Sequence, residues 1–435
     1  MRLLLLFVLL FGSDLLCAKL NLIKKESAKG DTTLLVIGGI HGNEPGGYFA
    51  AALLASHYTI TQNNLWIVPN LNAPSIVANR RGLHGDMNRK FSKIASNDKD
   101  KPTVEAIKKI ILQPRVSLVL NLHDGHGFYR KKAQGSIYNP NAWGQTCVID
   151  QCKLKQNQPF GNLNTIARSV KNSMNTRLLK KHHSFDVKNT NTKYDDEAMQ
   201  LSLTYFCVTN NKPAFAIETS KNLPSLAHKV FYQLLAIEEF MKIMHIQYKR
   251  DFDLNAKSIK KLLKEYGTVS INDNIMLPLS NIKSSLSYIP LRSNHNSFTF
   301  SHPLGSVKKI SAKRYALYIG NRRITTLNAQ YFQQEKHLPK SCRITVDNKD
   351  QRLTPKSILS VRHAFRVHRH KKMRVNVIGF WQKGRKDESE VFITLADLQK
   401  RYAIDKANTK YRVEFYRGKK FCFMVVVDFQ GDEKE

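Results

Sequence analysis

The segment LLVIGGIHGNE, residues 34–44, constrains the fold more than any other part of the chain. An apolar run ends in two glycines, and His41 and Glu44 follow just before a helix-like segment. This pattern predicts a buried strand, a glycine turn and the start of a helix. Open α/β sheets place their sites at the carboxyl ends of strands. We therefore expect His41 and Glu44 at such a site, where an imidazole and a carboxylate are suited to ligate one metal ion.

Short apolar runs alternate with helical patterns from residue 20 to about residue 247. The strands have almost continuous apolar sequences, which is typical of a sheet covered by helices on both faces. The sequence therefore predicts an α/β domain in this region. The predicted strands are 34–37, 65–68, 116–122, 147–149 and 214–217, and the predicted helices are 45–58, 104–111, 163–178 and 226–244.

The character of the sequence changes after residue 247. Short β-prone runs separated by Ser, Asn, Gly and Lys replace the alternating pattern, and the runs 411–416 and 421–429 predict a hairpin around RGKK. We expect two small β-rich domains here, the second of them sandwich-like. The predicted division is a signal peptide at 1–18, an α/β domain at 19–248, and β-rich domains at 249–338 and 339–435.

The net charge of +35 indicates an anionic partner, either nucleic acid or an anionic polymer outside the cytoplasm. Arg2, a short apolar run and Ala18 form a signal-peptide pattern, so we expect export to the periplasm with cleavage near Ala18. An exported chain without a recognisable reading module is not expected to bind nucleic acid. Cys147 and Cys152 either pair in that oxidising compartment or remain free thiols.

Two more polar residues lie at the ends of predicted strands. His123 follows the run 116–122 and is the predicted third ligand, because a catalytic zinc site has three protein ligands and one open position. Glu218 follows the run 214–217 and is the predicted general base, since partial burial raises the pKa of a carboxylate toward a useful range. The alternatives are a satisfied buried histidine and a structural carboxylate at a helix start.

The segment NRRGLHGDMNRKF, residues 79–91, is the predicted substrate clamp. Arginine binds carboxylates in a bidentate manner, so Arg89 with Asn88 is suited to hold a terminal carboxylate. Arg81 is suited to polarise the scissile carbonyl or to bind a second carboxylate. Asp86 is expected to hold the far nitrogen of His41, as zinc-binding histidines usually require. The alternative for this basic segment is a solvated surface loop.

HGNE, DMNR, the strand-end His123 and IET, in that order, resemble the zinc carboxypeptidases related to carboxypeptidase A. The resemblance covers residues 34–247 and implies an α/β fold with a mixed sheet and one Zn²⁺ per chain. Because Arg80 is adjacent to Arg81, it leaves open which of the two polarises the carbonyl. The implied roles are zinc ligands for His41, Glu44 and His123, general acid/base for Glu218, and substrate binding for Arg81, Asn88 and Arg89.

A second resemblance extends over the whole chain, through GGIHGNEPGGYFAA, RGLHGDMNRKFS, NLHDGHGFYR and NPNAWG. These segments resemble the periplasmic cell-shape peptidoglycan carboxypeptidases of helical Gram-negative bacteria, some of which carry Gln where this chain has His41. The resemblance implies D,L-carboxypeptidase activity that trims muramyl tripeptide to dipeptide by removing terminal meso-diaminopimelate. It also implies that Trp143 and Thr204 line the substrate pocket; the alternatives are loop packing and an ordinary strand residue.

Two other functions are compatible with the sequence. Amidases and deacylases of the aspartoacylase type share similar HxxE and NR motifs. A noncatalytic wall-binding protein is the other alternative, and it is disfavoured because predicted ligands, base and clamp are all present. In each case the β-rich domains are available for contacts with the wall or with cell-shape proteins.

Overall fold

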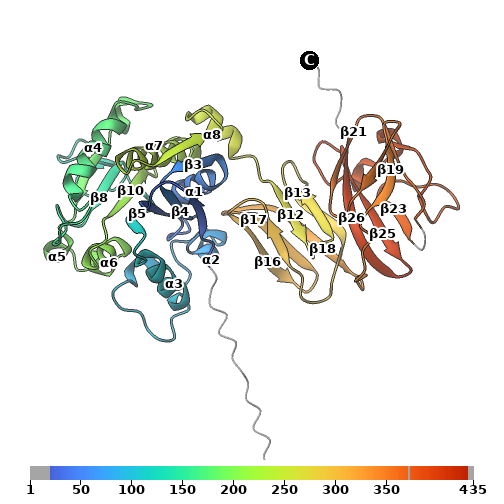
Figure 1. Ribbon diagram of the computed structural model, residues 1–435, viewed down its shortest axis with the longest axis horizontal. Coiled ribbons are helices and arrows are strands. Elements are labelled where there is room, and N and C mark those ends of the chain that lie inside the picture. Colours follow the sequence, from blue (N-terminus) through green and yellow to red (C-terminus); the bar gives the residue numbers. More distant parts are fainter. Residues whose placement is uncertain (1–19, 371–372, 430–435) are drawn as a thin grey trace, which may run out of the picture.

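The computed structural model describes residues 20–370 and 373–429, and the predicted signal peptide at 1–18 lies outside these ranges. Figure 1 shows three parts in chain order along the longest axis: an α/β part, a middle β part and a C-terminal β part. Within the described ranges, no helix is both long enough and apolar enough to cross a membrane.

A mixed sheet forms the centre of the α/β part. Within the described residues it has seven strands in the order β1-β4-β2-β5-β10-β8-β9. Neighbours from β4 to β10 are parallel, while β1 and β8 each run antiparallel to an inner strand. The predicted mixed sheet is confirmed. The strands are β1 (Ile23–Glu26), β2 (Thr33–Ile37), β4 (Asn64–Val68), β5 (Val116–Gly125), β8 (Thr146–Ile149), β9 (Asp186–Asn189) and β10 (Ala214–Ser220).

Helices cover both faces of this sheet (Figure 1). Three of them pack together on one face: α1 (Pro45–His57), α4 (Leu163–Asn175) and α7 (Leu226–Ile243). On the other face, α3 (Lys101–Ile111) contacts β5, and α6 (Leu203–Thr209) contacts β5 and β10. The smaller elements are α2 (Ala73–Val77), α5 (Thr192–Asp195), η1 (Met87–Arg89), η2 (Lys181–His183), η3 (Met199–Leu201), β6 (Phe128–Tyr129) and β7 (Tyr138–Asn139).

Glycines shape the turn between β2 and α1. Gly39 has φ of +76°, a conformation that strains residues with a Cβ. Gly47 lies so close to β5 that a Cβ would approach the Leu122 carbonyl oxygen to 2.8 Å. Pro45 occupies the first turn of α1, where its missing N–H costs no helical hydrogen bond. These features bring the turn carrying His41 and Glu44 directly beside β5.

Two strands are longer than their apolar runs. β5 continues to Gly125 and β10 to Ser220. His123 and Glu218 therefore lie inside paired strands, directly opposite each other in the parallel register, and each strand ends three residues later than predicted. The backbone ladder continues because the polar side chains face a pocket and do not disturb the hydrogen bonds between strands.

The middle part contains two small sheets within the described residues, in the orders β13-β12-β15 and β14-β18-β17-β16. β16 has an almost entirely exposed, polar sequence without alternation, which explains why it was not predicted. The strands are β12 (Thr268–Ile271), β13 (Ile275–Pro278), β14 (Ser285–Leu291), β15 (Phe298–Phe300), β16 (Gly305–Ser311), β17 (Arg314–Ile319) and β18 (Arg322–Tyr331).

The C-terminal part has two four-stranded sheets among the described residues, with a hydrophobic core of its own. The predicted hairpin is confirmed, because β25 and β26 pair antiparallel. The elements are β19 (Cys342–Val346), β20 (Lys349–Leu353), β21 (Ile358–Val361), β22 (Ala364–Val367), β23 (Arg374–Val377), β24 (Ile393–Thr394), η4 (Leu395–Asp397), η5 (Lys400–Tyr402), β25 (Lys410–Arg417) and β26 (Lys420–Phe429).

The α/β part and the middle part are tightly joined. β11 (Gln247–Arg250) pairs with β3 (Tyr58–Gln62), and α8 (Ala256–Leu262) packs against α7. The Arg322 guanidinium of the middle part lies 4.9 Å from the centre of the Phe49 ring on α1. One hydrophobic cluster extends through both parts and includes residues of β25 and β26 in the C-terminal part. The middle part is therefore packed onto the α/β part and is not tethered by a free linker.

Candidate functional site

A pocket of about 240 Å³ opens on the face of the sheet that α3 and α6 cover. Nine predicted site residues, from six separate segments of the chain, line this pocket. These residues are His41, Glu44, Arg81, Asn88, Arg89, His123, Trp143, Thr204 and Glu218. A larger cavity of about 860 Å³, lined by residues of the middle part and of the segment that follows β18, contains none of them.

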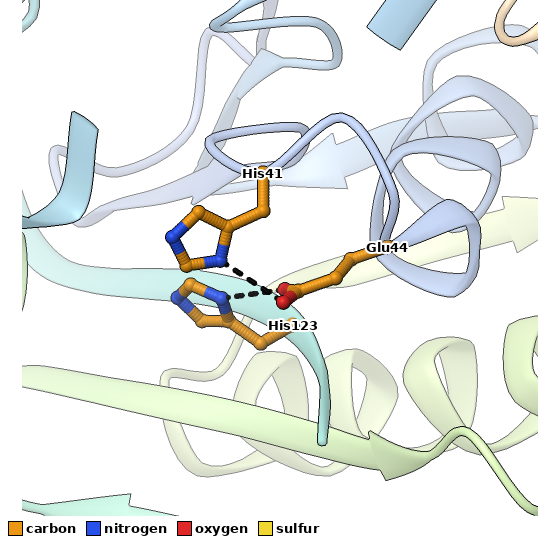
Figure 2. A group of neighbouring side chains, drawn as sticks. All are labelled: His41, Glu44 and His123. Atoms are coloured by element: carbon orange, nitrogen blue, oxygen red, sulfur yellow. Dashed lines mark hydrogen bonds and ion pairs between the residues drawn. The ribbon is translucent and has the colours of Figure 1, made fainter. Parts of the chain in front are cut away.

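His41, Glu44 and His123 form a compact cluster (Figure 2). Glu44 lies between the two imidazole rings: its Oε1 is 3.0 Å from Nδ1 of His41, and its Oε2 is 2.9 Å from Nδ1 of His123. One ligand atom from each residue lies within 4.8 Å of the other two. All three side chains are buried, so their orientations are fixed by packing.

Asp86 fixes the orientation of His41 from outside the cluster. Its Oδ1 lies 2.8 Å from Nε2 of His41, and its Oδ2 accepts a hydrogen bond from Nε of Arg81 at 2.9 Å. A carboxylate can only accept, so Nε2 of His41 carries the hydrogen and Nδ1 presents a lone pair toward Glu44. Asp86 occupies the position expected of it from the sequence.

This arrangement fits a metal ion. The buried Nδ1 of His41 makes no hydrogen bond within the described residues, although a Glu44 oxygen lies close to it. Two acceptors that face each other in a buried site repel, and a cation between them removes the repulsion. Two imidazole nitrogens and one carboxylate are a donor set that zinc accepts readily. The ligand set is open on the side of the pocket.

The electrostatics of the two glutamates differ strongly. Burial opposes ionisation of Glu44, but the two neighbouring histidines outweigh it and hold the pKa of Glu44 well below its ordinary value. Burial, reinforced by the Glu44 and Asp124 carboxylates, raises the pKa of Glu218 well above its ordinary value. One carboxylate is therefore suited to bind a cation, and the other is suited to exchange protons.

The charges of His41 and His123 also differ. Burial lowers the pKa of His123, which favours the neutral imidazole that ligates metals. At His41 burial also favours the neutral ring, but the Glu44 and Asp86 carboxylates outweigh it and raise the pKa.

The arginine segment 79–91 forms one wall of the pocket. Arg81 lines it and donates from Nη1 to Glu44 Oε1 at 3.2 Å, while Arg80 is exposed and lies outside the lining. Arg81 is therefore the arginine that faces the cluster of His41, Glu44 and His123. Asn88 is anchored because its Oδ1 accepts from the Leu203 N–H at 2.9 Å, which leaves its amide nitrogen free to donate to a ligand. Arg89 lies beside it at the pocket wall.

Trp143 and Thr204 also line the pocket. Thr204 belongs to the first turn of α6, so the alternative of an ordinary strand residue is wrong. The Lys188 ammonium lies 4.3 Å from the centre of the Trp143 ring and orients it by a cation–π contact. Cys147 and Cys152, which the sequence left open, are both free thiols, one buried and one exposed.

The buried carboxyl group of Asp150, next to β8, should make the free energy of unfolding depend on pH. Burial raises the pKa of its carboxyl to about 6, while hydrogen bonds from Thr192 and Thr204 act in the opposite direction. A folded-state pKa above the unfolded value means that stability falls as pH rises from about 4 to 6. We expect Asp150→Asn to gain up to about 3 kcal/mol relative to the unsubstituted chain between pH 4 and 7.5. Urea unfolding at both pH values measures this, and an unchanged difference would contradict it.

Lys221 and Asn121 are among the pocket residues that were not singled out from the sequence. Lys221, just beyond β10, places its ammonium 3.6 Å from Oε1 of Glu44 and lowers the local negative charge. Asn121 lies inside β5, two residues before His123. A polar residue within the apolar run VSLVLNL was the available signal for Asn121, whereas Lys221 follows Glu218 in a chain rich in lysine and gave no signal.

Comparisons with known proteins agree with this geometry. The profile of a family described as carboxypeptidase controlling helical cell shape, catalytic part, matches residues 1–264. A second profile, the C-terminal domain of metallo-carboxypeptidase, matches residues 335–430. None of the curated proteins matches the chain.

The cell shape determinant protein of Helicobacter pylori is similar along nearly the whole chain. Its apo and tripeptide-bound crystal structures each have 35% sequence identity and a TM-score of 0.88, covering 95% of this chain and 100% of that chain. Its mDAP-bound form, described as a D,L-carboxypeptidase, has 36% identity and a TM-score of 0.87, covering 94% of this chain and 100% of that chain. The chain therefore belongs to the family of carboxypeptidases that control helical cell shape, and it is a metallocarboxypeptidase.

Proposed function

We propose that this protein is a zinc-dependent D,L-carboxypeptidase that releases terminal meso-diaminopimelate from muramyl tripeptide, leaves the dipeptide, and thereby contributes to cell shape. The observation that carries the proposal is the His41–Glu44–His123 cluster facing Glu218 in one pocket. The similar Helicobacter pylori protein, for which tripeptide-bound and mDAP-bound structures exist, supports this choice of substrate.

Zinc is the proposed metal because two imidazoles and a carboxylate suit it, and the ligand set leaves a side open to the pocket. When bound, zinc supplies a Lewis acid for activating water and polarising a carbonyl. His41, Glu44 and His123 would hold it, and the hydrogen bond from His41 to Asp86 keeps the correct nitrogen available.

The remaining roles belong to side chains around the cluster. Glu218 takes a proton from the attacking water and delivers it to the leaving amine, and its raised pKa favours both transfers. Asn88 and Arg89 bind the terminal carboxylate of the substrate, and Arg81 donates to the scissile carbonyl. Trp143 and Thr204 enclose the residue that is released.

Export to the periplasm is part of the proposal and rests on the N-terminal pattern with its expected cut near Ala18. The high positive charge of the chain is suited to a polymer whose stem peptides carry several carboxylates. The two β parts are then available for contacts with the wall or with cell-shape proteins.

Incubation of the purified mature chain with muramyl tripeptide and zinc tests the proposed reaction. We expect mass spectrometry to detect free diaminopimelate and the muramyl dipeptide in equal amounts, and a chelator to stop their appearance. The corresponding muramyl tetrapeptide and an acylated aspartate serve as control substrates. Absence of diaminopimelate release from the zinc-loaded chain would overturn the proposed function, and cleavage of the acylated aspartate would favour an aspartoacylase-type deacylase.

A further inference from the structure

The floor of the pocket is built by one face of three neighbouring strands. Side chains alternate between the faces of a sheet, so Asn121 lies on the same face as His123. In the parallel register Asn121 is opposite Ala216, as His123 is opposite Glu218. Ala216 is small and leaves the space above Asn121 open. Asn121 therefore lies deeper in the pocket than the reacting groups, at about 7 Å along the strand.

The amide of Asn121 has no partner. Its side chain is fully buried, and neither Oδ1 nor Nδ2 makes a hydrogen bond within the described residues. Other buried amides of the same region are paired at one of their two polar atoms: Gln233 Nε2 donates to the His123 carbonyl at 2.7 Å, and Asn72 Oδ1 accepts from the Ser75 N–H at 3.3 Å. An unpaired buried amide destabilises a fold, and replacing it by an apolar residue would remove that cost. A buried amide without a hydrogen-bond partner at the floor of a substrate pocket is expected to bind substrate.

We infer that Asn121 is the specificity-determining residue of this pocket and that it recognises a side chain ending in both an ammonium and a carboxylate group. An amide offers one acceptor and two donors, so its Oδ1 can accept from the ammonium while its Nδ2 donates to the carboxylate. A purely cationic side chain would leave the amide nitrogen without a partner, and a purely anionic side chain would leave the amide oxygen without one. This inference rests on the proposed function and identifies what selects the released residue.

The reach of the substrate agrees with this position. When its terminal carboxylate is held at Asn88 and Arg89, diaminopimelate extends three methylenes to a carbon bearing the second ammonium and carboxylate. The depth of about 7 Å between His123 and Asn121 suits this length. Val148 and Met199, which also line the pocket, are apolar and suit the methylenes. A lysine side chain would bring only an ammonium group to the same depth.

Steady-state kinetics on two substrates test the inference: muramyl tripeptides ending in meso-diaminopimelate or in L-lysine. We expect Asn121→Leu to lower kcat/KM for the diaminopimelate substrate by about 10- to 100-fold. We expect Asn121→Asp to lower the preference for diaminopimelate over lysine at least about 10-fold, because a carboxylate accepts from the ammonium and repels the second carboxylate. An unchanged preference in both variants would overturn the inference.

Two further measurements separate recognition from a structural role. Calorimetric titration with free meso-diaminopimelate should show weaker binding to Asn121→Leu. The melting temperature of this variant should rise, since a buried unpaired amide is removed. Thr33→Val is the matched control: its hydroxyl is also fully buried and unpartnered on the same sheet, yet lies outside the pocket. It should gain stability without changes in kinetics or binding.

The two proposals fail in different ways. If the unsubstituted chain releases no diaminopimelate, the proposed function fails before Asn121 is considered. If that chain is active and Asn121→Leu retains full kcat/KM and binding, Asn121 has no role in recognition while the proposed function stands. A melting temperature that falls in Asn121→Leu, with unchanged selectivity in Asn121→Asp, would assign the residue to structure alone.

Discussion

Replacing Glu218 by glutamine is expected to lower the rate of diaminopimelate release by about 10²- to 10⁴-fold, the usual contribution of a general acid/base. Glutamine has nearly the same shape and fills the same place opposite His123 in the register, but it cannot take a proton from water. The effect arises because Glu218 faces the metal-binding cluster and its raised pKa equips it to exchange protons. Initial rates with muramyl tripeptide, followed by mass spectrometry, measure the loss.

The design of this experiment separates chemistry from binding. Zinc content should remain at one per chain, because Glu218 is not a member of the ligand cluster. Affinity for the tripeptide should also remain within a few-fold of the unsubstituted chain. Glu105→Gln is the matched control, since Glu105 lies on the exposed side of α3 and does not line the pocket. Substantial activity in Glu218→Gln would remove Glu218 from the proposed role.

Replacing His123 by alanine is expected to remove the metal and, with it, the activity. The loss of an outer-sphere partner alone usually weakens metal binding about 10- to 100-fold, so the loss of one of three ligands should weaken it further. The remaining His41 and Glu44 cannot enclose a cation, and the cavity left at His123 opens the site to water. Zinc stoichiometry after dialysis, by elemental analysis, should fall from one to near zero.

His126 supplies the control for this substitution. It lies three residues beyond His123 and also lines the pocket, but its side chain is exposed and it does not belong to the ligand cluster. His126→Ala should therefore retain one zinc per chain. If zinc remained bound to His123→Ala and was lost from His126→Ala, the ligand assignment would pass to His126. A folded state for both variants is checked by circular dichroism.

The α/β part was largely predictable because its signals are local. Buried parallel strands read as apolar runs and amphipathic helices show a helical period, so the boundaries of β2, α1 and α7 lie within two residues of the predictions. The middle β part was predicted less completely. One of its strands, β16, is polar and exposed along almost its whole length, and such a strand lacks the alternation that identifies a half-buried sheet.

The sequence by itself determined which kinds of side chain this protein brings to its site. The glycine turn with His41 and Glu44, the arginine segment 79–91, and polar residues after apolar runs were all visible as local patterns. Only the tertiary structure decided which of them meet. The order of strands places β5 between β2 and β10, and the register sets His123 opposite Glu218.

The same reason explains the finer choices. Arg81 faces the pocket and Arg80 faces solvent, and Asn121 is left unpaired on the floor, because these orientations depend on contacts between segments far apart in the chain. A local pattern carries residue type and periodicity. It does not carry strand order, the direction of a side chain in an irregular loop, or the presence of a hydrogen-bond partner contributed by another segment. Those are set by packing, and they convert a set of suitable residues into a site.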